Sequence, residues 1–150
     1  MNGKHSPVSS TAALLDAIAT GRADDLAGVI EALQAHVLDG ADLEQALGLD
    51  RCSRLRARNQ ALEQAAAVLS SGSPSAWETA RRLADAVHRF KSRLWLRCKS
   101  NPAGLGPVDE ALRIAFLTGE KVPTSPKRLL QFTDAIALTC PLSERDHECT

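Results

Sequence analysis

Three prolines divide the second half of the chain, and each stands directly after a serine or a glycine, at Pro74, Pro107 and Pro126. Proline is tolerated in the first turn of a helix, where the missing N–H has no intrahelical partner, and it disrupts a helix interior or a central strand. Apolar residues follow each proline at helical spacing. The pattern therefore predicts that a helix begins at each of these prolines.

Alanine and leucine dominate the composition, with 24 and 21 of the 150 residues, against seven valines, four isoleucines, five aromatic residues and no tyrosine. This composition favours helices and is poor in the residues typical of sheets. We therefore predict an all-α protein, a compact bundle of six or seven helices with one long central helix. The expected helices cover about residues 10–19, 23–39, 41–47, 51–69, 75–99, 107–118 and 126–139.

One domain accounts for a chain of this length. Residues 1–9 and 140–150 are polar, so we expect them to be flexible tails around a single helical domain at 10–139. The proline and glycines within 100–106 mark the candidate sub-boundary inside that domain.

The helix expected at 75–99 is the longest. Ser75 and Glu78 have the spacing of a capping box at its start. Phe90 belongs to an apolar stripe at helical spacing and should be buried in the core with the other members, which are Leu83, Val87 and Leu94. The helix expected at 23–39 carries a similar stripe, made of Leu26, Val29, Ile30, Leu33 and Val37.

Several classes of protein are disfavoured by what the sequence lacks. No apolar run approaches the roughly 20 residues of a membrane span, and the N-terminus has no apolar signal segment, which predicts a cytoplasmic protein without membrane contact. The four cysteines form no CxxC pair and are expected to be free thiols. Cys140, His147 and Cys149 lack a recognised zinc spacing, so we expect no metal and no cofactor. Phosphate-loop and nucleophile-elbow motifs are missing too, and we expect no enzyme.

The 18 basic and 18 acidic residues cancel, but they are segregated along the chain. Residues 1–50 have two bases and eight acids (net −6), residues 51–100 have 11 bases and three acids (net +8), and residues 101–150 have five bases and seven acids (net −2). Such a positive block attracts nucleic-acid phosphates or an acidic protein face. The alternative is that the acidic first third folds against the basic middle third.

The helix expected at 75–99 also carries a row of arginines. Counted at about 100° per residue, its members lie within about 80° of one another, and they are Arg82, Arg89, Arg93 and Arg97. Guanidinium groups one turn apart repel one another and match phosphates well. The acids of the first two helices are the alternative source of neutralisation. Trp77 and Trp95 share another face, which predicts either a partner-binding surface or a second buried face.

The segment 41–62, ADLEQALGLDRCSRLRARNQAL, places a short helix, a glycine turn and an arginine-rich helix in succession. It resembles a helix-turn-helix, in which Gly48 would take the turn and the second helix would enter the major groove. The resemblance implies that Arg54 and Arg58 contact nucleic acid, although Arg54 stands where that family buries an aliphatic residue. An ordinary corner between two helices is the alternative.

The segment 119–132, GEKVPTSPKRLLQF, offers a helix start followed at once by Lys127 and Arg128. It is similar to the reading helix of small phage and plasmid regulators, which implies that these two bases bind anions. The alternative is a capped helix with two solvated bases. Together, LRARNQAL and VPTSPKRLL also resemble small prophage proteins.

The function predicted from these patterns is that of an α-helical nucleic-acid-binding regulator or accessory protein of a phage or mobile element. The competing class is a protein-binding inhibitor or adaptor that engages a host protein through its acidic first third or the Trp77 and Trp95 face. A structural or oligomerising helical protein is the third class.

Overall fold

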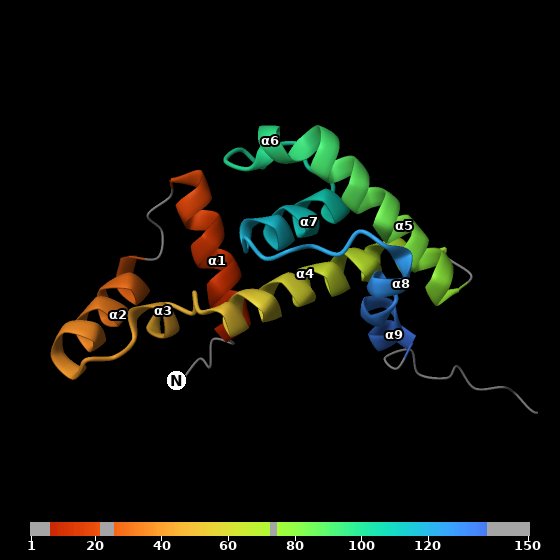
Figure 1. The fold of residues 1–150 in the computed structure, drawn as a ribbon. Coiled ribbons are helices and arrows are strands. Elements are labelled where there is room, and N and C mark those ends of the chain that lie inside the picture. The colour runs from red at the N-terminus through yellow and green to blue at the C-terminus, as the bar shows by residue number, and fades with distance from the viewer. Residues whose placement is uncertain (1–6, 22–25, 73–74, 138–150) are drawn as a thin grey trace, which may run out of the picture.

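The computed structural model describes residues 7–21, 26–72 and 75–137, and all regular secondary structure in these ranges is helical (Figure 1). The helices are α1 (Pro7–Thr20), α2 (Leu26–Asp39), α3 (Leu43–Ala46), α4 (Arg51–Ser70), α5 (Ala76–Arg89), α6 (Trp95–Cys98), α7 (Pro107–Leu117), α8 (Pro126–Leu129) and α9 (Gln131–Ala137). A π-helical turn, η1 (Phe90–Leu94), joins α5 to α6 in one rod, and only Leu130 separates α8 from α9. The predicted all-α bundle is confirmed.

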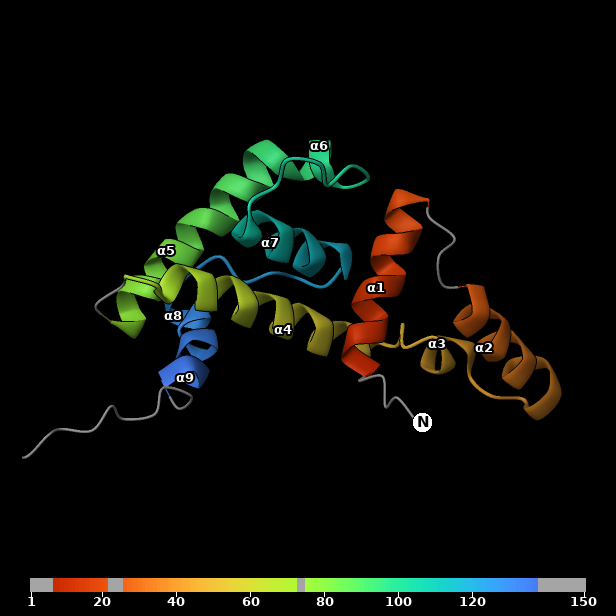
Figure 2. The ribbon, with the colours of Figure 1, turned by 180° about the vertical axis from the view of Figure 1, so that it is seen from behind.

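Two long elements share the centre of the bundle, namely α4 and the α5–α6 rod. α4 packs against α1, α5, α7 and α9, and α5 packs against α4, α7, α8 and α9. Figures 1 and 2 show α7 between α4 and the rod, and α1 crossing the N-terminal half of α4. The predicted long central helix is therefore confirmed.

Alanines line the buried face of α4. Ala61, Ala65 and Ala66 all belong to the core, and Leu62 fills the space beside them. Because the distance between packed helices depends on the side chains at their contact, these short side chains let α7 come close to α4. The high alanine content thus serves packing as well as helix propensity.

Phe90 occupies the centre of the core and is completely buried. Its ring centroid lies 6.3 Å from that of Trp95 and 5.4 Å from that of Phe116. Leu83 and Val87 are buried beside it in the same cluster, as predicted, whereas Leu94 is only partly buried.

Local signals account for several helix starts. Pro107 and Pro126 each begin a helix, as predicted, whereas Pro74 lies outside the described residues. The Ser75 hydroxyl accepts a hydrogen bond from the Glu78 backbone N–H at 3.2 Å, which is half of the predicted capping box. The other half is not formed, because the Glu78 carboxylate pairs with Arg81 and Arg82 of its own helix.

Two helix boundaries differ from those expected. α1 begins at Pro7, not at Ser10, because proline is favoured in the first turn here as elsewhere in the chain. The last helix is interrupted after α8, where the Thr133 hydroxyl donates to the Leu130 carbonyl oxygen at 2.7 Å. A side chain that bonds this carbonyl competes with the regular helix pattern.

Three members of the apolar stripe of α2, Ile30, Leu33 and Val37, are exposed. Ile30 is 51% exposed and Val37 is 76% exposed. Among the described helices, α2 makes substantial contact only with α3, so no neighbour covers its apolar face. Figure 1 shows α2 and α3 set apart from the other helices.

Candidate nucleic-acid interface

All basic residues of the α5–α6 rod are exposed, and so is Lys99, which directly follows the rod. The set is Arg81, Arg82, Arg89, Lys91, Arg93, Arg97 and Lys99. Only Glu78 and Asp85 are acidic in the rod, and both precede Arg89. The second half of the rod is therefore a strongly positive surface.

The π turn changes the predicted arginine row. In η1 the Trp95 N–H bonds to the Phe90 carbonyl five residues back, so this turn holds one residue more than an α-turn. One extra residue rotates everything beyond it by about 100° relative to a continuous α-helix. Arg82 and Arg89 both lie on α5, before the π turn, so the angle between them is as predicted. Arg93 lies within the turn. Arg97 lies beyond it and is rotated away from the face that the other arginines were expected to share.

Only part of the row is neutralised inside the protein. Arg82 pairs with Glu78 at 3.4 Å, and Arg89 pairs with Asp109 at 3.5 Å. Within the described ranges, neither Arg93 nor Arg97 has a carboxylate within 4.0 Å.

The acids of the first third that the structure describes form no ion pair with the arginine row. Asp16 pairs with the buried Arg113 of α7, which is outside the row. The acids of α2 and α3 form no ion pair with any described residue, and these acids are Glu31, Asp39 and Glu44. Asp24 and Asp25 lie outside the described residues.

Arg54 and Arg58 of α4 are held by the segment that follows α7. Arg54 forms an ion pair with Glu120 at 3.2 Å. Arg58 donates to the Lys121 carbonyl oxygen at 2.8 Å and to the Asn59 side chain. These arginines therefore fix the course of this segment, which sequence reasoning did not anticipate.

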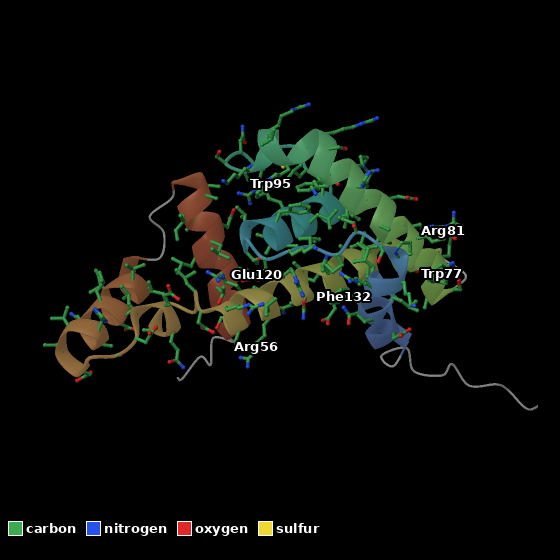
Figure 3. The ribbon with its side chains drawn as sticks, viewed as in Figure 1. Arg56, Trp77, Arg81, Trp95, Glu120 and Phe132 are labelled. Atoms are coloured by element: carbon green, nitrogen blue, oxygen red, sulfur yellow. The ribbon has the colours of Figure 1, made fainter. Side chains whose placement is uncertain are left out.

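The predicted glycine turn before α4 is present. Gly48 has a φ of 67°, and its carbonyl oxygen accepts a bond from the Thr11 hydroxyl of α1 at 2.8 Å. Asp50 caps α4, and hydrogen bonds from the Ser53 hydroxyl and backbone hold the pKa of Asp50 below its usual range. Most of the inner face of α4 is used for packing, while Arg56 is exposed on the outside (Figure 3).

Two adjoining cavities lie between the rod and the segment 119–126. Thr124 lines both cavities. The larger measures about 620 Å³, and the smaller about 560 Å³. We call these cavities and the five cations that line them the cationic cleft, and the cations are Arg89, Lys91, Arg93, Lys121 and Arg128. Asp85 and Glu120 are the two acids of the lining, so the residues that line the cationic cleft carry a net charge of +3.

The predicted anion site at α8 is partly joined to this cleft. Arg128 lines the larger cavity, whereas Lys127 is exposed outside both. Lys91 and Lys121 were not predicted, because they are 30 residues apart and only the tertiary fold brings them to one cavity.

The two tryptophans have different environments. Trp95 is partly buried against Phe116, with ring centroids 5.4 Å apart, and the Lys99 ammonium lies 5.8 Å from its ring. Trp77 is 50% exposed at the start of α5. Figure 3 shows the two residues toward opposite ends of the rod, so they do not form one binding face.

The described residues contain no group of three metal-ligating side chains, and Cys140, His147 and Cys149 lie outside them. Cys52 is exposed and Cys98 is buried, both as free thiols. Burial raises the pKa of the Cys98 thiol. None of the helices in the described part of the chain has the length and apolar character that a membrane span requires.

Comparison with known proteins adds no relative, since no protein-family model, curated protein or solved structure gives a significant match to this chain.

Proposed function

We propose that this protein binds nucleic acid, chiefly through phosphates, along the cationic cleft. The observation that carries the proposal is the gathering of five cations around two adjoining cavities, with a single ion pair, Arg89 to Asp109, among them in the described part of the chain. Arginine and lysine bind phosphate oxygens through charge-assisted hydrogen bonds, and binding releases the counterions of the nucleic acid.

The predicted contact residues divide into three groups in this proposal. Arg89, Arg93 and Arg128 line the cleft and contact phosphates directly. Arg97 and Lys127 are exposed outside the cavities and add to the positive field, whereas Arg82, which pairs with Glu78 away from the cleft, adds little. Arg54 and Arg58 shape the cleft by holding Glu120 and Lys121.

In this role the protein acts by binding, without catalysis, in the cytoplasm. A place in a phage or other mobile element is supported by the resemblance of segment 119–132 to small phage and plasmid regulators, and by that of LRARNQAL with VPTSPKRLL to small prophage proteins.

The test is the salt dependence of binding to DNA and RNA. A double Arg89→Ala, Arg93→Ala variant should bind more weakly, and the slope of log K against log salt on duplex DNA should flatten by nearly two, since each phosphate contact contributes about 0.9. Its melting temperature should change little, because exposed ion pairs contribute little to stability.

The matched control is Arg81→Ala with Arg82→Ala, which removes two arginines of the same rod that pair with Glu78 away from the cleft. It should keep most of the slope. Absence of salt-sensitive binding by the natural protein, or an equal loss in the control, would contradict the proposal.

A second candidate function is favoured by the exposed apolar face of α2. Ile30, Leu33 and Val37 lie on it and are exposed, whereas Glu31 and Asp39 lie on the other side of this helix. An exposed apolar stripe on a helix suits a protein partner with an apolar surface, and the acids elsewhere on α2 favour a partner that carries positive charge. This candidate is the protein-binding alternative, acting through the acidic first third.

A photo-crosslinking amino acid at position 33 tests this candidate by identifying the partner in cells. The purified partner should then bind the natural chain, and Ile30→Asp with Val37→Asp should weaken binding by about tenfold or more, since the interface centre carries most of the affinity. Unchanged affinity of that variant would refute the candidate, and its binding of nucleic acid should not change.

A further inference from the structure

The larger cavity of the cationic cleft combines two kinds of wall. Trp95 and Phe116 provide aromatic surface on one side. Lys91, Lys121 and Arg128 provide charge, and the Thr124 and Ser125 hydroxyls lie among them. Both rings pack on the core, and the part of them that lines the cavity offers an organic ligand contacts that an inorganic anion cannot make.

The size of this cavity, which is open to solvent, suits a small ligand or one unit of a polymer. Its volume of about 620 Å³ falls within the range of about 300–1,000 Å³ that is typical of small-molecule sites. The unit of a nucleic acid that matches such a site in size and chemistry is one nucleotide, with a flat base and a charged phosphate.

We propose that the cavity takes one unpaired base of a single-stranded nucleic acid, which contacts Trp95 while the adjacent phosphates bind Lys91, Lys121 and Arg128. This inference rests on the proposed function and deepens it. Bases stack on aromatic side chains in proteins that bind single strands, and a positive groove follows the backbone.

The second cavity continues the path of the strand. It adjoins the first at Thr124 and is lined by Arg89 and Arg93. A neighbouring phosphate of an extended strand would lie there. A duplex cannot place a base in the first cavity without unpairing it and flipping it out of the stack, which is energetically unfavourable. The cleft therefore selects single strands over duplexes.

The two tryptophans of the chain allow a direct test. Trp77→Phe leaves Trp95 as the sole tryptophan, and the change is mild because Trp77 is half-exposed. Oligothymidylate of about 12 nucleotides, which suits known single-strand site sizes, should quench Trp95 emission in this variant. A duplex of equal length should quench it far less.

Two further variants make the test specific. Trp95→Phe keeps Trp77 as the sole tryptophan, and its emission should not respond to the oligonucleotide. Lys91→Ala with Lys121→Ala should weaken single-strand binding by about tenfold or more, because it removes two charge-assisted contacts. The control Arg81→Ala, Arg82→Ala should weaken it much less.

The anisotropy of a labelled oligonucleotide, measured in parallel, separates the two levels of the proposal. Binding without quenching of Trp95, or equal quenching by the duplex, would overturn insertion of a base and leave phosphate binding intact. No binding of any single strand or duplex would overturn the proposed function itself, and the inference with it.

Discussion

Arg113 is a buried cation that joins three parts of the chain. Its side chain is 2% exposed. It donates to the carbonyl oxygens of Cys98 and Lys99 at 2.8 and 2.9 Å and to the Asp16 carboxylate of α1. A cation at this place suits the negative end of α6 and satisfies carbonyls that have no helical partner.

Arg113→Ala should lower the free energy of unfolding by about 3 kcal/mol, since it breaks a buried ion pair and removes the side-chain donor of the Cys98 and Lys99 carbonyls. The figure is at the lower end of the usual range because Asp16 keeps some access to water. Urea denaturation measures the change. Arg54→Ala is the control, because its pair with Glu120 is more exposed, and it should cost no more than about 1 kcal/mol. Equal costs would contradict this account of Arg113.

The thiols of Cys52 and Cys98 should differ in reactivity. Burial raises the pKa of Cys98 and so lowers the thiolate fraction that reacts, whereas Cys52 is exposed. Iodoacetamide at neutral pH, followed by peptide mass spectrometry, should modify Cys52 in the folded protein and Cys98 only after denaturation. Comparable rates for the two thiols would show that Cys98 is accessible in solution.

At the scale of elements, the π turn decides how the long rod presents its side chains. It lets Phe90 and Trp95 both contact Phe116, and it turns Lys91 toward the larger cavity and Arg93 toward the smaller one. The Ser92 hydroxyl donates to the His88 carbonyl oxygen at 2.9 Å, which helps to satisfy the backbone of the widened turn.

Deletion of Ser92 should be tolerated, because it converts the wide turn to an α-turn and leaves both flanking helices in register. We expect a loss of about 1 kcal/mol, a typical value for a single change. Deletion of Asp85 is the control. It lies within regular α5 and would rotate one side of the core stripe by about 100°, so cooperative thermal unfolding should be lost. If both deletions unfold the protein, the extra residue of the π turn is required for the fold.

The whole molecule consists of a well-packed body around α4 and a pair of helices, α2 and α3, of which α2 has few tertiary contacts. α4 packs against four other helices, whereas α2 makes substantial contact only with α3 among the described elements. Figures 1 and 2 show α2 and α3 set beside the body in both views.

The backbone amides of α2 should therefore exchange with deuterium much faster than those of α4, since few tertiary contacts oppose local opening. α1 is the control. It packs on α4 and α7, and its Asp16 forms an ion pair with Arg113, so its amides should be protected more than those of α2. Mass spectrometry of peptides resolves the three helices. Protection of α2 equal to that of α4 would mean that a partner, such as a second copy of the chain, covers its apolar face.

Local sequence signals are sufficient to predict the fold class and several helix starts. Pro107 and Pro126 begin helices and Gly48 takes a positive φ because these effects depend on the residue itself and its immediate neighbours. Phe90 was predictable as a core residue because it lies in an apolar stripe of helical period.

Which apolar helix faces are buried, and which charged side chains lie close together, depends on how the helices pack in the folded chain. The stripe of α2 has helical spacing, as does the stripe that contains Phe90, yet Ile30, Leu33 and Val37 stay exposed, because burial requires a second surface that the pattern does not specify. The π turn shifted Arg97 and Trp95 from the faces that a regular helix predicts. Lys91 and Lys121 meet at one cavity because Arg54 and Arg58 hold the segment after α7 against α4, and contacts between residues so distant in sequence arise only when the chain packs.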